Sequence, residues 1–443
     1  MTVGTGPAWL PHLPDGWMLG KLMGLVEEVK NPNSGMKNQN LLSLSYGNIV
    51  RKDIDSSEGL RPESYETYNV IAKNDIVLRL TDLQNDQVSL RSGLAREDGI
   101  VTSAYVTVRP NETLINPSFL AYFLRFTDLT KVIYSLGSGL RSSMSYSDLR
   151  SLPIALPSRL QQNEITDFLD RETAEIDAFI ADQERLIEIL EERRDAVVQQ
   201  LVTQGCGEKD LAFDPKRPWL GYFPVAWPVV PLRAFLEETD ERAGERSMGL
   251  PLLSVSIHSG VVPRNELTDR VSRAEDFSNY RVCHKDDLVL NRMRAFQGGL
   301  GIAPMQGLVS PDYMVCHLNE RIVPEYCYHL LRSSGFVAQM IRALRGLGDV
   351  EQGNARTPRI NPGDFLRCRV SLPTVAQQEN ILTKISDSLT MIDPTIKDAQ
   401  RSIELSRERR SALISAAVTG QLDVCSELSE GPVRMKPSEE RTS

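Results

Sequence analysis

The chain has 443 residues, enough for two to four domains that each bury a core. Its 50 basic and 59 acidic side chains argue against a protein that binds nucleic acid over its whole surface, although local basic faces stay open. We find no apolar run of the ~20 residues that a membrane-spanning helix needs. There is no secretion signal, and the six cysteines lack metal-site spacing, so a cytoplasmic protein is expected.

The first block, residues 1–155, has a mixed α/β pattern. The segments LLSLS (41–45), NDIVLRL (74–80) and AYVTVRP (104–110) are typical of strands. The segment PSFLAYFLRFTDLTKVIYSL (117–136) is typical of a helix with a proline in its first turn. A loop rich in Gly and Ser follows it.

The next segment, residues 156–205, predicts a long acidic helix of ~28 residues, roughly 42 Å in length. A shorter helix that begins near Gln161 is expected to end just before it. Residues spaced alternately by four and three form a heptad seam with two polar interruptions. They are Ile176, Ile180, Gln183, Ile187, Leu190, Arg194, Val197 and Leu201.

Residues 206–373 repeat the pattern of the first block, with strands predicted at LLSVS (252–256), DDLVLNRM (286–293) and DYMVCHL (312–318). A second seam then follows in residues 374–424. It comprises Ile392, Ile396, Ala399, Ile403, Ser406, Arg410, Leu413 and Ala417. Asp393 and Pro394 are expected to begin this second long helix, as an N-cap and a first-turn proline. Residues 425–443 form a polar tail that we expect to be disordered.

The two helical segments are copies of one another. Residues 156–203 align with residues 372–419 without a gap, and 18 of the 48 positions are identical, including the motifs LP, QQ, ID and ERR. The blocks before them also align, with small shifts that fit insertions in loops. The chain is therefore two copies of one unit, a mixed α/β block followed by a helical segment.

A helix with one apolar seam needs a partner, and two similar seams favour packing on each other. A pseudo-two-fold axis would make the pair antiparallel. Alternatively, each seam could be buried against its own block. Arg194 and Arg410 occupy equivalent seam positions, where they would set the register or extend from the seam edge toward water.

Catalytic motifs are missing from the sequence. There is no P-loop, HExxH, GxSxG or kinase signature, and the histidines are isolated, so we predict no catalytic residue and no metal site. The segment NPSF (116–119) is similar to a motif of adenine-N6 methyltransferases. Its counterpart in the second copy, which begins at Val323, lacks the asparagine, and no glycine-rich cofactor loop precedes either one. Helix initiation explains both segments.

The order of these elements resembles the specificity subunit of type I restriction-modification systems. The resemblance rests on the helical phrases Gln161–Thr203 and Gln377–Thr419, and on the strand signals KNDIVLR (73–79) and KDDLVLNRMR (285–294). It covers nearly all of residues 14–424.

The resemblance and the seams together predict an α/β (mixed α+β) fold with two tandem target-recognition domains. Long helices that pair as an antiparallel coiled coil with pseudo-two-fold symmetry would separate them. The expected segments are recognition domain 1 (1–155), a central helical spacer (156–205), recognition domain 2 (206–373), a C-terminal helical spacer (374–424) and the tail (425–443).

The resemblance also implies partners. Each recognition domain would bind one half of a split double-stranded DNA sequence, and the paired helices would fix the gap between the halves. The helices would also dock two methyltransferase subunits that hold S-adenosylmethionine. Separate motor-nuclease (restriction) subunits would use ATP and Mg. This chain would hold no cofactor and catalyse nothing.

Candidate DNA-binding residues lie in or beside the loops that break the alignment of the two copies. We select them mainly because Arg and Lys bind guanine edges and phosphates, whereas Asn and Gln bind adenine edges. In the first copy they are Arg51, Lys52, Arg79, Arg91, Arg96, Arg141 and Ser142. In the second copy they are Arg264, Asn291, Arg292, Arg294, Gln297, Arg345, Asn354 and Arg356.

Other classes of protein stay open. A coiled-coil scaffold with two protein-binding domains would carry apolar rather than arginine-bearing loops. A self-sufficient methyltransferase or nuclease would need a cofactor loop or a metal-binding carboxylate set, and neither is evident. A specificity subunit of a modification enzyme outside type I also fits the sequence.

Overall fold

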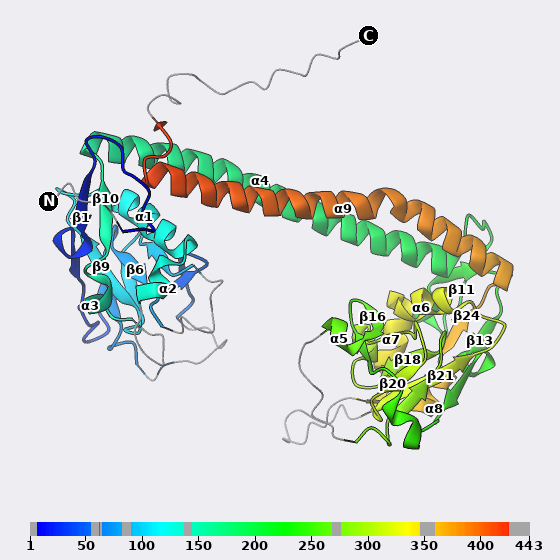
Figure 1. Ribbon diagram of the computed structural model, residues 1–443. Helices are drawn as coiled ribbons and strands as arrows, with labels where there is room; N and C mark the ends of the chain where they lie inside the picture. Colours follow the sequence, from blue (N-terminus) through cyan, green and yellow to red (C-terminus); the bar gives the residue numbers. More distant parts are fainter. Residues whose placement is uncertain are drawn as a thin grey trace, which may run out of the picture. The chain divides into compact units, whose positions relative to one another are not determined.

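The computed structural model describes residues 7–54, 62, 64–81, 90–136, 144–267, 276–345 and 359–424. The predicted disordered tail, 425–443, lies outside these residues. The described chain forms two compact units, and each contains one block and a part of both long helices (Figure 1). Unit 1 contains residues 7–184 and 400–424, and unit 2 contains residues 185–399.

Unit 1 is built on a four-stranded antiparallel sheet. In spatial order its strands are β2 (Val26–Glu28), β9 (Val106–Pro110), β6 (Ile76–Leu78) and β7 (Ser92–Leu94). Three ribbons accompany it: β1 (Met18–Lys21) with β10 (Pro153–Leu156), β3 (Leu42–Ser45) with β4 (Asn48–Arg51), and β5 (Asn69–Ile71) with β8 (Gly99–Val101). The helices are η1 (Leu22–Gly24), α1 (Pro117–Leu129), α2 (Val132–Leu136) and α3 (Tyr146–Leu149).

Unit 2 repeats this architecture. Its sheet runs β14 (Leu236–Thr239), β21 (Tyr313–Leu318), β18 (Leu288–Asn291) and β19 (Leu300–Ile302). The matching ribbons are β13 (Val229–Pro231) with β24 (Arg369–Ser371), β15 (Leu253–Ser256) with β16 (Gly260–Pro263), and β17 (Arg281–Cys283) with β20 (Gly307–Val309). Two further ribbons pair β11 (Leu211–Phe213) with β12 (Tyr222–Pro224), and β22 (Leu344–Arg345) with β23 (Arg359–Ile360). The sequence repeat is therefore also a repeat of strand topology.

Short helices complete unit 2. They are η2 (Pro218–Leu220), η3 (Leu232–Ala234), η4 (Gly244–Met248), α5 (Arg264–Leu267), η5 (Ala295–Gln297), α6 (Pro324–Arg332), α7 (Ser334–Arg342) and α8 (Pro362–Arg367). The two helices α6 and α7 follow each other directly, because Ser333 ends α6 and caps α7. Its hydroxyl accepts a hydrogen bond from the backbone N–H of Phe336, which begins a new helix.

The central strands β6 and β18 are buried on both faces, which explains their short, continuously apolar sequences. In unit 1, Ile76 and Leu78 pack into the core that contains α1, whereas Val77 points to the opposite face and a separate cluster with Leu42. In unit 2, Leu288 and Leu290 pack with α6, and Val289 packs on the other face.

The long helices are α4 (Arg159–Gln204) and α9 (Val375–Val418), and each is continuous. The prediction of a short helix that ends before each long one is therefore wrong. Pro394 was expected to begin a helix, but it lies inside α9. Its side chain faces solvent, so the backbone carbonyl that loses its partner can bond water instead, while Ile392 and Ala399 stay buried.

The QQ motif fixes the start of each long helix. Gln161 Oε1 accepts a hydrogen bond from the backbone N–H of Ser158, whose hydroxyl accepts from the N–H of Gln161; this is a capping box. Thr374 and Gln377 repeat it. The next glutamine, Gln162, is buried and accepts from the N–H of Asn116 at 2.7 Å. Gln378 does the same for Val323 at 2.8 Å. Each block is thus tied to the helix that follows it.

The helices α4 and α9 also pack together. In unit 1, Arg410 Nε lies 2.9 Å from Asp177 Oδ1, and Arg407 Nη2 lies 3.0 Å from Glu184 Oε1, so the helices run antiparallel. In unit 2, Arg194 Nε lies 3.0 Å from Asp393 Oδ1. The offset of 216 residues relates Arg194 to Arg410 and Asp177 to Asp393, so the ID and ERR motifs form the same ion pair twice.

The seam residues are covered to different degrees. Ile176, Ile392 and Ile403 are buried, and the half-buried members are Ile180, Ile187, Leu190, Val197, Leu201, Ile396 and Leu413. Arg194 and Arg410 lie at the edge of the seam with side chains 45% and 23% exposed, where each reaches an aspartate of the other helix. Among the described residues, no helix is long and apolar enough to cross a membrane.

Candidate nucleic-acid interface

The β3–β4 hairpin carries the first two candidate residues, Arg51 and Lys52, and both are exposed. Arg51 Nε donates a hydrogen bond of 2.7 Å to Glu97 Oε1, and this bond lowers the pKa of the Glu97 carboxyl. Part of the charge of Arg51 is therefore compensated within the protein. Lys52 extends the hairpin by one backbone hydrogen bond from its N–H to the carbonyl of Leu41.

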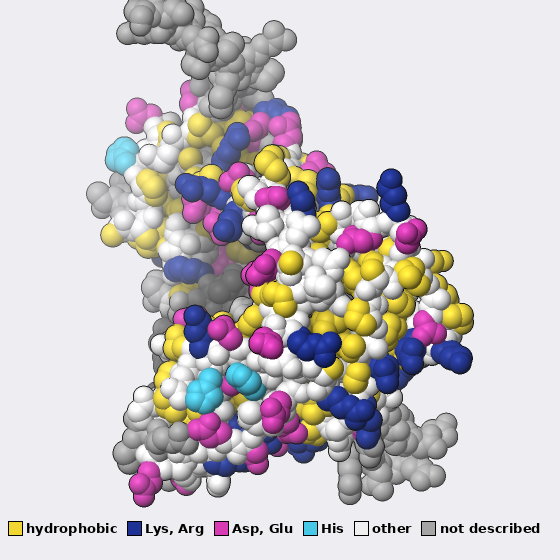
Figure 2. Space-filling model, turned by 90° about the vertical axis from the view of Figure 1, so that its right-hand side faces the viewer, with side chains coloured by type: hydrophobic (Ala, Val, Ile, Leu, Met, Phe, Trp, Pro, Cys, Tyr) yellow, Lys and Arg dark blue, Asp and Glu magenta, His cyan; other side chains and the backbone are white. Residues whose placement is uncertain are grey.

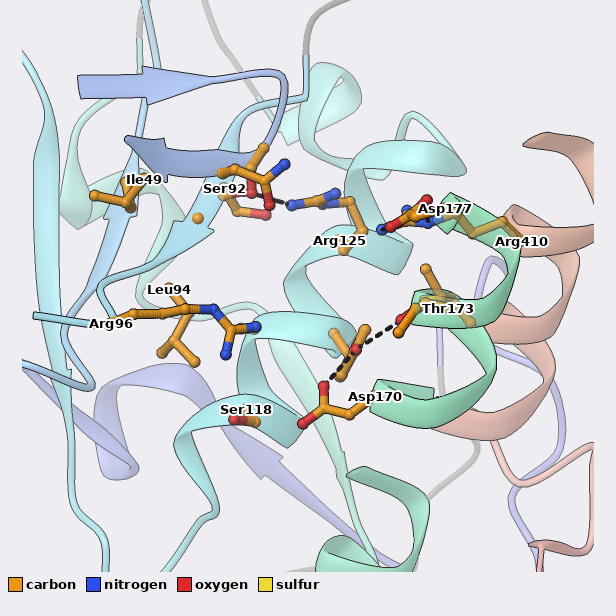
Figure 3. Close-up of a pocket in the computed structure, with 17 residues that line it drawn as sticks. Ile49, Ser92, Leu94, Arg96, Ser118, Arg125, Asp170, Thr173, Asp177 and Arg410 are labelled. Carbon is orange, nitrogen blue, oxygen red and sulfur yellow. Dashed lines mark hydrogen bonds and ion pairs between the residues drawn. The ribbon is translucent and has the colours of Figure 1, made fainter. Parts of the chain in front are cut away.

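A cavity of about 430 Å³ lies between this hairpin, α1 and the two long helices of unit 1 (Figure 3). Arg96, an exposed candidate, lines it together with Arg125 and Ser92. Nη2 of Arg125 donates to the backbone carbonyls of Gly47 and Ser92, the latter at 2.9 Å. Burial, reinforced by the charge of Arg410, lowers the pKa of Arg125 to about 10, so it stays a cation at neutral pH.

Arg79 and Arg91 flank the loop between β6 and β7, of which residues 82–89 lie outside the described chain. Arg79 is half-buried. Arg91 is 0% exposed, and its Nη1 donates 2.7 Å to the backbone carbonyl of Thr81. A side chain so placed supports the fold from inside and does not present its guanidinium to a ligand.

The equivalent loop of unit 2, between β18 and β19, is described in full. Asn291 Oδ1 accepts from the N–H of Met293, and the carbonyl of Arg294 accepts from the N–H groups of Gln297 and Gly299. Arg294 and Gln297 are exposed, whereas Asn291 and Arg292 are half-buried. Arg292 Nε donates to the carbonyl of Ile360 at 3.2 Å, so its side chain holds β23 in place. Arg294 and Gln297 are therefore the two candidates in this turn whose side chains face solvent.

In each unit, an arginine from the helix after the sheet donates hydrogen bonds to backbone carbonyls near the candidate residues. Arg125 of α1 binds carbonyls of Gly47 and Ser92, and Arg332 of α6 donates to the carbonyl of Gly298 at 2.8 Å. The guanidinium of Arg332 also lies 5.2 Å from the ring centroid of Tyr328. The sequence patterns did not single out either arginine, because their helix positions suggest packing.

The remaining candidates are scattered. Arg264 begins α5 and is half-buried, and Arg345 lies on β22, where its backbone pairs with Arg359. Arg141, Ser142, Asn354 and Arg356 lie outside the described residues. On the face shown in Figure 2, Lys and Arg side chains are mixed with Asp and Glu over much of the surface, and several Lys and Arg gather toward the lower right.

Two sequence signals proved to be structural. Asn116 of NPSF caps α1, because its side chain accepts from the N–H groups of Ser118 and Phe119. The Asp of KND is buried: Asp75 accepts from the N–H of Ala72 and pairs with Arg109 at 2.7 Å. Its counterpart Asp287 pairs with His317. Among the described residues, no cluster of three or more His, Cys, Asp or Glu could hold a metal ion.

Comparison with known proteins gives a consistent picture, although no family model matches the chain. The Type I restriction enzyme EcoKI specificity subunit of Escherichia coli (strain K12) is 21% identical over 432 residues, which cover 93% of this chain and 90% of that protein. By its name, that relative supplies the specificity of an enzyme.

One solved structure shares the fold, and a second is a weaker match. One chain, from a structure described as the structural basis underlying complex assembly and conformational transition of the type I R-M system, is 15% identical with a TM-score of 0.60. The match covers 93% of this chain and all of that one. The HsdS subunit from Thermoanaerobacter tengcongensis is 14% identical with a TM-score of 0.45, over 93% of this chain and 99% of that one. The predicted resemblance of this chain to the specificity subunits of type I restriction-modification systems is thereby confirmed over more than nine-tenths of its length.

Proposed function

We propose that this chain is the DNA-recognition subunit of a type I restriction-modification complex. Each unit carries one recognition domain, and each domain binds one half of a bipartite DNA site. The observation that carries the proposal is a strand topology repeated twice with different loops, in a chain that resembles a specificity subunit along nearly its whole length. A shared frame with different loops suits a protein that recognises two different half-sites.

The paired helices are proposed to act as an antiparallel coiled coil with pseudo-two-fold symmetry that sets the gap between the half-sites. Support comes from the reciprocal pairs Arg410–Asp177 and Arg194–Asp393, which fix one register in each unit. Each domain also shares a core with both helices: α4 and α9 contribute Phe168 and Ile414 in unit 1, and Val202 and Ile385 in unit 2. A domain held on both helices follows their register.

The partners follow from the same proposal. Two methyltransferase subunits dock on the helical segments and bring S-adenosylmethionine, and restriction subunits bring ATP and Mg. This chain contributes recognition alone and works in the cytoplasm. The acidic helix α4, with 5 Arg against 12 Asp and Glu, suits protein docking better than contact with DNA phosphates.

Selection of duplexes from a random pool by the purified complex tests the proposal. We expect two fixed sequence elements separated by a gap of constant length, because two domains on one spacer act as a ruler. A pool without enrichment, from a complex whose assembly is verified, would instead favour the scaffold of two protein-binding domains.

Replacing Arg294 by Ala is expected to weaken DNA binding of the complex by about 5- to 100-fold, the size of one lost base or phosphate contact. If the lost contact is to a phosphate, the slope of log K against log salt also falls by about one. Fluorescence anisotropy with a labelled duplex at several salt concentrations measures both quantities.

Arg233→Ala is the matched control, because Arg233 is an exposed arginine of the same unit outside the β18–β19 turn. Arg292→Ala is a poor substitute, since it also removes the bond to Ile360. Equal affinities and slopes for Arg294→Ala and the unaltered complex would remove this turn from the interface.

A further inference from the structure

The turn between β3 and β4 holds a tyrosine in a backbone conformation that tyrosine seldom adopts. Ser45 pairs with Asn48, so Tyr46 and Gly47 are the two loop residues. Their φ angles are 46° and 77°, in the left-handed region that a type I′ hairpin turn requires at both positions. Asn-Gly and Asp-Gly are the preferred pairs there, and a bulky side chain at the first position is strained.

Packing does not explain Tyr46. Its side chain is 80% exposed, and its hydroxyl has no hydrogen-bond partner within the part of the chain that the structure describes. A large aromatic ring in water on a strained backbone lowers stability, and no contact among the described residues offsets this cost. Such residues are concentrated at functional sites, where the strain positions a group for a ligand.

The tip that carries Tyr46 is held rigidly. Arg125 of α1 donates to the carbonyl of Gly47 in the turn and to that of Ser92 on β7. A Cβ atom on Gly93 would lie 2.7 Å from Leu44 Cδ1, so β7 and β3 approach closely only because this residue is glycine. The ring is therefore presented from a fixed turn rather than from a freely moving loop, which suits a recognition contact.

The second copy differs at this tip. Ser256 pairs with Gly260, so the β15–β16 turn has three residues, Ile257, His258 and Ser259. Of its two larger side chains, Ile257 is half-buried and His258 is exposed. The frames of the two hairpins match, and an insertion falls on the tip itself. A change in the length and side chains of the tip is expected where two domains recognise different bases.

We propose that Tyr46 is a DNA-contact residue of recognition domain 1, with its ring packed against a base of the half-site that this domain binds. The inference rests on the proposed function. A neutral aromatic ring matches the flat face of a base. Exposed Lys52, next to the same hairpin, and exposed Arg96, which lines the cavity beside Gly47, supply positive charge for phosphates. Tyr46 would then add sequence preference to the electrostatic attraction of its neighbours.

Tyr46→Asn separates function from fold, because asparagine suits the turn better than tyrosine. We expect its complex to unfold at the same or a higher temperature, yet to bind the selected duplex about 5- to 100-fold more weakly, the range for loss of one base–aromatic contact. The salt slope should stay unchanged, because no cation is lost. Tyr46→Phe keeps the ring and should retain most of the affinity. Tyr222→Asn, at another exposed tyrosine on β12, should have no effect.

Motif mapping with the same complexes identifies the half-site. Tyr46→Asn should relax the preference at one or two positions of one half-site and leave the other half-site intact. If the unaltered complex selects a split motif and Tyr46→Asn reproduces its motif and affinity, the inference is wrong and the proposed function stands. If the unaltered complex selects no split motif, both fail.

Discussion

A chain shortened to residues 1–208 is expected to form a symmetric dimer through two antiparallel copies of α4. The reason is the reciprocity of the ion pairs. Arg194 is the equivalent of Arg410, so Arg194 of one copy can meet Asp177 of the other in both directions. Val198 and Val202 stand at the positions of Ile414 and Val418, which fill the core of unit 1. The contact is self-complementary, as a two-fold interface requires.

The consequence for recognition is large. A complex built on this dimer carries recognition domain 1 twice, so its DNA motif should change from two different half-sites to one half-site and its inverted copy. Light scattering gives the mass of the shortened chain, and methylation mapping gives the motif. Asp177→Arg places like charges opposite each other and should weaken the dimer. Adding Arg194→Asp reverses both pairs and should restore it. A folded but monomeric 1–208 would contradict the proposed pseudo-two-fold pairing.

Asp75→Ala should lower the free energy of unfolding of unit 1 by about 3 kcal/mol, the lower end of the range for breaking a buried charged pair. The carboxylate is 1% exposed and receives the N–H of Ala72 and two bonds from Arg109. The lower end applies because Arg109 is 51% exposed, so water solvates its charge after the pair is lost.

Denaturant unfolding followed by fluorescence measures this loss. Asp75→Asn keeps one acceptor for the N–H of Ala72, so its free energy of unfolding should lie between those of the unaltered chain and Asp75→Ala. Asp287→Ala is the matched change in unit 2, where a histidine replaces the arginine and makes no two-pronged pair, so a smaller loss is expected there. A loss below about 1 kcal/mol at Asp75 would show that the turn is held by other contacts.

The strands and the repeat could be predicted from the sequence because burial on both faces leaves short apolar runs at matching positions. The pairing of α4 with α9 could also be predicted from the sequence, since the seams and the repeated ID and ERR motifs lie at the contact. The break before the second long helix was predicted wrongly, because the pair Asp393 and Pro394 indicates a helix start whenever local propensity alone is considered. The apolar contacts of Ile392 and Ala399 outweigh that local preference.

The candidate interface was less accessible to sequence reasoning. Selecting charged and amide side chains near loops found Arg294, Gln297 and Arg96, which are exposed. It also selected Arg91, whose complete burial leaves no mark in the sequence. Tyr46 was missed, because the strain at its position is visible only in the φ angle of the folded turn.

We propose that two domains on one helical spacer recognise two half-sites at a fixed distance. Co-expression of this chain with its methyltransferase partner, followed by single-molecule mapping of N6-methyladenine on host DNA, tests it most directly. We expect methylation at a split motif whose two parts differ and whose gap has one length. Methylation at a continuous motif, or at parts separated by variable gaps, would contradict it.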